Sequence, residues 1–217
     1  MKISMVYDQG TSSRREDGFV AAGNRLFDVL DGVSAPYSPK HPPKMFNGMS
    51  GGEMVVRLVE QHLITTAMSI NPPDLLNKVL AANALVHQNH HLNGLEMKDA
   101  GVLAGATFAF MMIYEKNLEI RQVGDCMAIV ELKNGEIIVT PNQVRLHDEE
   151  MNDKIKQLQR EVSKELFNLS LEELFEENRA KVRGEMWNRF YQSNLKTRRE
   201  RINNPETAFG FGLLNGQ

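Results

Sequence analysis

The sequence contains a single cysteine, Cys126, among its 217 residues. One cysteine excludes an internal disulfide and a cysteine-rich zinc site, and it is typical of a protein from a reducing compartment. An excess of charge of either sign is also missing, because 25 Lys and Arg stand against 28 Asp and Glu, for a formal net charge of −3. This balance argues against a bulk electrostatic affinity for nucleic acid or for an anionic membrane surface.

Long apolar runs are missing as well. No run approaches the roughly 20 residues that a membrane-spanning helix needs, and the first residues form a short alternating segment instead of a signal peptide. We therefore expect a soluble, cytoplasmic protein. The length favours one domain over residues 1–217, either simple or with an insertion, and 41% hydrophobic residues suffice for a sizeable core.

The stretch that organises the chain covers residues 26–34, where a mostly apolar strand delivers Asp31 and Gly32 to its end. An ordinary strand-ending Asp-Gly turn is the simpler interpretation, because this dipeptide is common in turns. Upstream, Glu16 and Asp17 lead into another apolar stretch. If these acids join Asp31 across neighbouring strands, they form a cluster of oxygen ligands suited to Mg²⁺ or Mn²⁺.

The rest of the first 140 residues combines strands with two helices. Ser50 is a suitable N-cap for the first helix, and the second follows prolines at positions 72 and 73. Their apolar positions have helical spacing: Val55, Leu58, Val59 and Leu63, then Leu75, Val79, Ala82 and Val86. Strands are expected at 3–7, 106–114, 118–123, 127–132 and 136–140, the later ones as an antiparallel meander with a hairpin at Asn134-Gly135. The pattern predicts an α+β fold in which helices cover sheets.

Three histidines, His87, His90 and His91, close the second helix. A pair four residues apart could bind a transition metal. Histidine near a helix C-terminus is also favourable for the helix dipole, so we interpret this cluster as structural.

Residues 146–202 are different in kind. Apolar residues spaced by threes and fours from Met151 to Leu169 predict one amphipathic helix. Ser170 and Glu173 form a capping-box pattern, from which a second long helix is expected to begin at Leu171 and to carry an aromatic group. That group is Trp187, Phe190 and Tyr191.

A basic cluster lies near the end of this second helix, at Lys196, Arg198, Arg199 and Arg201. A helical nucleic-acid module is one interpretation of such a cluster. A solvated helix end that matches the helix dipole is the preferred one, given the balanced charge, so we expect neither nucleic acid nor a membrane as a partner.

Four stretches, in order, resemble the metal-dependent Ser/Thr protein phosphatases of type 2C. Residues 14–17 (RRED) resemble the first acidic motif of that family, and residues 27–34 (FDVLDGVS) its strand ending in Asp-Gly. Residues 105–107 (GAT) are similar to its Gly-Ser/Ala-Thr strand opening, and residues 123–128 (VGDCMA) to its Val-Gly-Asp-Ser-Arg-Ala turn. The resemblance covers about residues 1–140 and the last dozen.

The resemblance implies an αββα sandwich with two or more Mg²⁺ or Mn²⁺ ions at one end and a phosphoprotein substrate. Asp31 would bridge two ions, and the carbonyl of Gly32 would ligate one of them. Glu16 and Asp17 would hold metal-bound waters, and Asp125 would serve an additional ion. In the same comparison residues 146–202 form an enlarged helical flap.

The chain also departs from the family pattern. Ser12 stands at the position of the phosphate-binding arginine, for which Arg14 or Arg15 would substitute, and Val33 stands where many members have histidine. The later Asp-Gly-x-x-Asp and Asp-Asn motifs do not follow Asp125. An alternative function is therefore a non-catalytic regulatory or binding protein on a phosphatase-like scaffold, with a partner or a second copy bound through the helical insertion.

Overall fold

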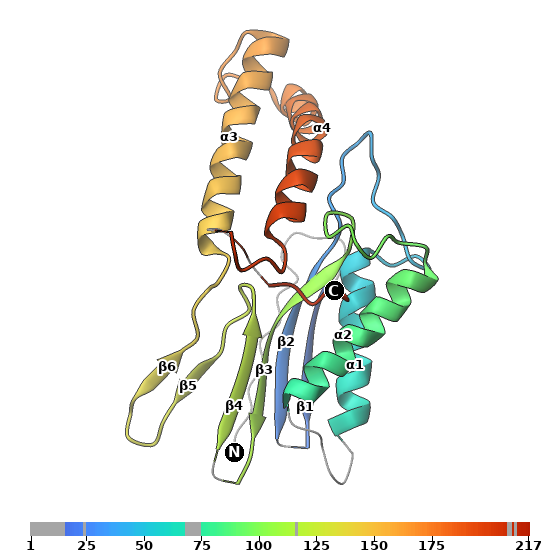
Figure 1. Cartoon of the computed structure of the whole chain (residues 1–217). Coiled ribbons are helices and arrows are strands. Elements are labelled where there is room, and N and C mark those ends of the chain that lie inside the picture. The colour runs from blue at the N-terminus through green and yellow to red at the C-terminus, as the bar shows by residue number, and fades with distance from the viewer. Residues whose placement is uncertain (1–15, 24, 68–74, 116, 208–209, 211) are drawn as a thin grey trace.

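The main sheet of the computed structural model has four antiparallel strands in the order β1-β2-β3-β4 (Figure 1). They are β1 (Asp17–Ala22), β2 (Leu26–Val33), β3 (Gly105–Ile113) and β4 (Leu118–Val123). The structure describes residues 16–23, 25–67, 75–115, 117–207, 210 and 212–217. The strand expected at residues 3–7 lies outside this part. The strand expected at 118–123 has those bounds, and β3 begins one residue before the expected 106–114. The strands expected at 127–132 and 136–140 are shorter, at 129–131 and 137–139.

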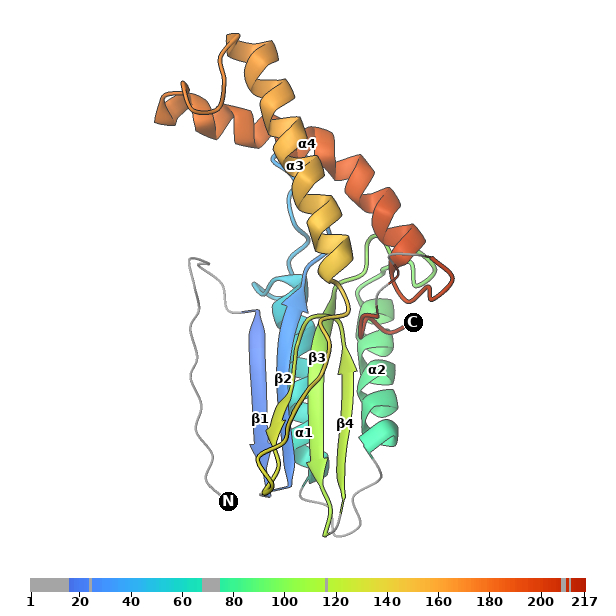
Figure 2. The ribbon, with the colours of Figure 1, turned by 90° about the vertical axis from the view of Figure 1, so that its left-hand side faces the viewer.

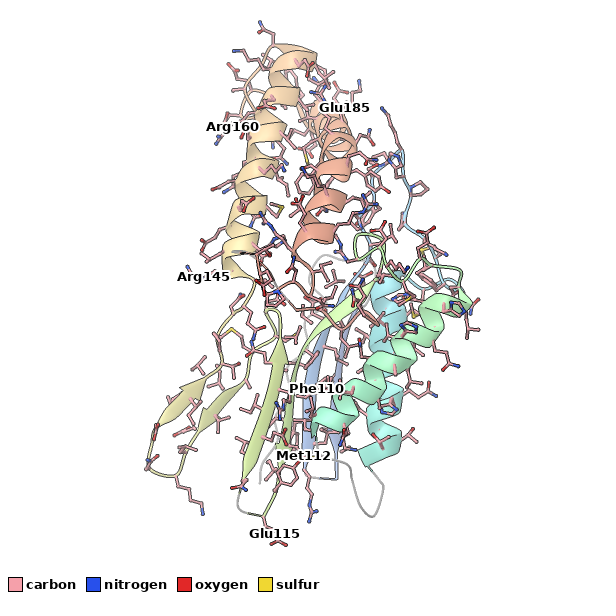
Figure 3. All side chains as sticks on the ribbon, viewed as in Figure 1. Phe110, Met112, Glu115, Arg145, Arg160 and Glu185 are labelled. Atoms are coloured by element: carbon pink, nitrogen blue, oxygen red, sulfur yellow. The ribbon has the colours of Figure 1, made fainter. Side chains whose placement is uncertain are left out.

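Two helices, α1 (Gly51–Ala67) and α2 (Leu75–Leu92), cover one face of this sheet (Figures 1 and 2). The Oγ of Ser50 accepts a hydrogen bond from the amide of Glu53 at 3.1 Å, which confirms Ser50 as the cap of α1. The predicted apolar stripes face the sheet, with six of their members fully buried: Val55, Val59, Leu63, Leu75, Ala82 and Val86. Phe110 and Met112 of β3 meet them from the sheet (Figure 3).

Side chains along β2 alternate between the two faces of the sheet, as a strand requires. Leu26 and Leu30 are buried against the helices. Val29 lies on the opposite face, where it remains 44% exposed. Asp31 lies on the same face as Val29, which is the face that α1 and α2 do not cover.

A separate two-stranded sheet consists of β5 (Ile129–Glu131) and β6 (Ile137–Val139), joined by a turn in which Gly135 has a φ of 84°. The hairpin predicted at Asn134-Gly135 is therefore confirmed. The continuous meander was wrong, because β5 does not pair with β4 and the chain leaves the main sheet after β4 (Figure 1). Apart from this hairpin, no described strand forms a second sheet of an αββα sandwich.

Two long helices, α3 (Arg145–Phe167) and α4 (Glu176–Arg201), form an antiparallel pair that projects beyond one end of the sheet (Figure 1). The pair has its own core, which contains Met151, Val162, Val182, Met186 and Phe190. The amphipathic helix predicted from Met151 onward is thus confirmed, and its apolar face packs on α4.

The start predicted for the second helix was wrong. The capping-box hydrogen bond forms, with the amide of Ser170 donating to Oε2 of Glu173 at 2.8 Å. It closes a turn after α3, however, and α4 begins five residues later than expected, at Glu176. Leu174 is buried in the core of the helical pair, so packing of this loop decides where the helix starts.

The aromatic residues of α4 are divided between three environments. Phe190 is buried between α3 and α4, and Trp187 contacts it edge-on with ring centroids 5.7 Å apart. Tyr191 stacks on His41 of the loop after β2, with centroids 4.1 Å apart. The three side chains therefore do not form one exposed stripe.

Candidate functional site

The register of the sheet brings two of the predicted acidic residues side by side. Asp17 of β1 pairs with Asp31 of β2, and Asp31 pairs with Thr107 of β3. Directly paired residues of antiparallel strands point to the same face. The hydroxyl of Thr107 then donates to Oδ1 of Asp125 at 2.8 Å. Three aspartates from separate stretches of sequence therefore gather at one end of the sheet.

Two glycines of the motifs permit close backbone contacts at this end. A Cβ on Gly32 would lie 2.5 Å from the carbonyl oxygen of Glu16 and 2.8 Å from the backbone of Gly52. Gly124 has a φ of 82°, and a Cβ there would collide with the side chain of Thr107. Both glycines are needed for the strands and α1 to approach one another.

Burial and electrostatic repulsion both act on the acidic cluster. Burial, and then the charges of Asp125, Asp17 and Glu16, raise the pKa of Asp31 to about 7. Burial also raises the pKa of the Cys126 thiol, to about 11, partly offset by a hydrogen bond with Thr107. The cysteine is therefore a protonated thiol.

The donor types suit a hard divalent cation, and positive charge would relieve the repulsion that acts on Asp31. Among the described residues, however, no group of three or more His, Cys, Asp or Glu side chains is arranged to hold a metal ion. Glu16 accepts a hydrogen bond from Ser34 Oγ at 2.8 Å. The carboxylates of Asp17, Asp31 and Asp125 therefore fit a cation in charge and in donor type. Among the described residues they do not form a closed set of ligands.

Three further predicted residues, Arg14, Arg15 and Gly32, have no tested role. Arg14 and Arg15 lie outside the described residues, so the phosphate-binding role stays a prediction. The carbonyl of Gly32 lies against Gly52 at the start of α1. Its role as a metal ligand likewise stays a prediction.

One acidic residue near the cluster was missed in the sequence analysis. Two hydrogen bonds join Gln143 to the turn that carries Asp125, and we call this pair the Gln143 clasp. The backbone amide of Gln143 donates to Gly124 O at 3.0 Å, and its side-chain Oε1 accepts from Gly124 N at 3.1 Å. This clasp fixes the start of α3, whose first turn contains Asp148. Partial burial and then the charge of Asp125 raise the pKa of Asp148. The available signal in the sequence was the run of acidic residues at 148–150, at the start of this helix.

The basic end of α4 anchors the helical pair beside this site. Arg198 is 7% exposed and donates to Leu103 O at 3.0 Å, and burial lowers its pKa to about 10. Arg199 binds Asp99 through two hydrogen bonds of 2.7 and 2.8 Å, and Arg201 binds Glu150 at 2.9 Å. The expectation of a solvated helix end was therefore wrong for Arg198.

The histidines of α2 have structural contacts. His90 is buried and its Nε2 lies 2.9 Å from Ala104 O. Nδ1 of His87 lies 2.8 Å from Gly216 O, which holds the C-terminal segment against α2. The two rings therefore contact different backbone carbonyls instead of facing one point.

No family model and no curated protein match this chain. It is similar to solved bacterial phosphatases. One is the serine/threonine phosphatase PstP of Mycobacterium tuberculosis, with 20% identity, coverage of 67% of this chain and 58% of that one, and a TM-score of 0.46. Another is the serine/threonine phosphatase Stp1 from Staphylococcus aureus, with 18% identity, coverage of 67% and 55%, and a TM-score of 0.45.

A further structure of PstP contains its catalytic domain in complex with two manganese ions, with 21% identity, coverage of 64% and 56%, and a TM-score of 0.46. This chain thus spans a little over half the length of these phosphatases. They are serine/threonine phosphatases, the class of enzyme that the sequence motifs resemble. Within the described part of the chain, no helix is both long enough and apolar enough to cross a bilayer.

Proposed function

We propose that this chain is a metal-dependent serine/threonine phosphoprotein phosphatase whose cation site is built around Asp31. The observation that carries this proposal is the row formed by Asp17, Asp31 and Thr107, with Asp125 joined to it through Thr107. These residues come from all four of the stretches that resemble the phosphatase motifs. Their convergence is what a shared site requires and what an ordinary Asp-Gly turn does not explain.

The residues of the site have separate tasks. Asp31 lies at the centre of the acidic cluster and holds the cations, and Asp125 is oriented by Thr107 for a further ion. Glu16, positioned by Ser34, and Asp17 orient water at the same edge. Bound Mg²⁺ or Mn²⁺ supplies a water of lowered pKa and neutralises charge on the phosphoryl oxygens. Cys126 remains a protonated thiol and takes no part as a nucleophile.

Calorimetric titration with Mn²⁺, together with hydrolysis of an aryl phosphate, tests this proposal. We expect Mn²⁺ binding and Mn²⁺-dependent hydrolysis in the wild type and the loss of both in Asp31→Asn. The control is Asp153→Asn, which changes an exposed aspartate on α3 and should leave both unchanged. A wild type that neither binds Mn²⁺ nor hydrolyses the aryl phosphate would contradict the proposal.

A non-catalytic scaffold is the second candidate. It is favoured by the α3–α4 pair, which extends from the sheet and has a core of its own. Mn²⁺ binding without hydrolysis in the experiment above would support this candidate, because the acidic cluster would then be structural.

A further inference from the structure

The end of the α3–α4 pair that is remote from the sheet carries two adjoining hollows, of about 370 and 390 Å³. They share Leu171 and Glu172 of the loop between the helices. We call this end, residues 159–183, the tip. The larger hollow is also lined by Leu169 and by two basic residues of α3, Arg160 and Lys164. Figure 3 shows Arg160 on the upper part of α3.

Arg160 and Lys164 are four residues apart on an α-helix and therefore project from the same face. Both side chains are exposed, and neither forms an ion pair with another described residue. Arg183, across the tip, differs from them because it lies 4.0 Å from Glu176. The larger hollow thus combines an apolar wall with two cations that form no ion pair with a described residue, and Glu172 lines it as well.

The tip also carries an exposed aromatic side chain and an exposed acidic side chain. Phe175 is 72% exposed, the largest exposed fraction of any aromatic residue among the described exposed hydrophobics. It occupies the N-cap position of α4 without a side-chain cap hydrogen bond, and phenylalanine is not a residue that N-caps favour. Glu177, two positions further, is exposed and has no ion pair with a described residue. Capping of α4 therefore does not explain an exposed phenylalanine at this position.

We propose that the tip is a self-association surface, in which Phe175 of one copy enters the Leu169–Leu171 hollow of a second copy and its Glu177 faces Arg160 and Lys164 there. A two-fold axis repeats each contact, because the surface carries both the hollow and the side chain that fills it. The unpaired acid and the unpaired bases complement one another between copies. This inference does not depend on the proposed phosphatase activity.

The expected dimer is weak. Only one end of a helical pair takes part, so the interface should fall below the roughly 800 Å² per partner of a standard stable complex. The charge pairs lie at a solvent-exposed rim, so salt should weaken the dimer further. Association should therefore depend on both protein concentration and ionic strength.

Sedimentation velocity of the full chain over a wide range of concentrations tests the proposal. We expect a monomer–dimer equilibrium in the wild type and a dissociation constant raised about tenfold or more by Phe175→Ser, since exposed aromatic anchors dominate such interfaces. The matched control is Leu92→Ser, which removes a side chain that is 75% exposed at the end of α2, away from the tip. The control should dimerise as the wild type does.

A charge exchange provides a second, independent arm. Lys164→Glu and Glu177→Lys should each weaken the dimer about threefold to tenfold, and the double variant should recover much of the loss. All positions are exposed, so the variants should unfold with the wild-type midpoint. A wild type that stays monomeric at every concentration would overturn the proposal. So would a dimer that is insensitive to Phe175→Ser and to both charge reversals.

Discussion

Asp17 and Asp31 are direct cross-strand partners whose side chains share one face of the sheet. Their carboxylates repel when both are ionised, and this repulsion adds to burial and to the charge of Asp125 in raising the pKa of the half-buried Asp31 to about 7. A divalent cation removes this repulsion without a proton. The acidic end of the sheet is therefore stabilised either by protonation or by a cation.

Thr107→Val should weaken Mn²⁺ binding by about tenfold, because a ligand residue loses the hydrogen bond that orients it. Thr107 is buried, and its hydroxyl donates to Asp125 at 2.8 Å. Valine keeps the shape of threonine and removes the donor. Thr107→Ser keeps the donor and serves as the control in calorimetric titration. Equal affinity of the valine variant and the wild type would show that Asp125 needs no such support.

Asp148→Asn should weaken Mn²⁺ binding by roughly fivefold, or about 1 kcal/mol, the value expected for one solvent-screened charge near the cation. The prediction rests on the Gln143 clasp, which fixes the first turn of α3 beside Asp125. Glu149→Gln is the control, because Glu149 is an exposed neighbour that pairs with Arg145. If Asp148→Asn and Glu149→Gln both bind Mn²⁺ with the wild-type affinity, the charge of Asp148 has no role at the site.

Asp28 should make the protein less stable as the pH rises. Burial raises the pKa of Asp28 from 3.8 to about 8, and the charge of Glu60 adds to the rise. Neither carboxyl oxygen of Asp28 has a hydrogen-bond partner among the described residues. The folded state therefore binds the proton more tightly than the unfolded state, and stability falls between about pH 4 and pH 8.

Urea unfolding of Asp28→Asn over this pH range tests the prediction. Across this range the free energy of unfolding of the wild type should fall by up to about 5 kcal/mol more than that of the variant. This value follows because each unit of pKa shift corresponds to about 1.4 kcal/mol. The control Asp153→Asn should keep the wild-type slope, because that side chain is exposed. Parallel slopes for the wild type and Asp28→Asn would contradict the buried, protonated state of Asp28.

Gly32→Ala should destabilise the fold by about 1–3 kcal/mol, the usual cost of overpacking. The added methyl group would meet the backbone of Glu16 and of Gly52, neither of which can rotate away. Gly184→Ala is a control of opposite sign. A Cβ there has only an ordinary contact, 3.8 Å from Pro39, so alanine should stabilise α4 by about 0.5–1 kcal/mol. Thermal or urea unfolding measures both, and a harmless Gly32→Ala would show that β2 and α1 can move apart.

Local patterns predicted most of the secondary structure. The stripes of α1 and α2 were recognisable because burial of one helix face imposes a period of 3.6 residues. The hairpin at Asn134-Gly135 was recognisable because its turn needs a positive φ at glycine. The start of α4 was not, because a capping pattern at Ser170 forms in a short turn as readily as in a helix. There the packing of Leu174 decided the outcome.

The sequence by itself determined which residue types are available for chemistry: carboxylates at Glu16, Asp17, Asp31 and Asp125, and glycines beside three of them. Only the tertiary structure decided which of these meet, because strand register and the Thr107–Asp125 hydrogen bond bring together residues more than 100 positions apart. It alone placed Asp148 near Asp125 and buried Arg198 of α4 against Leu103. Long-range contacts of this kind leave no local period in the sequence, whereas the strands and helices that carry them do.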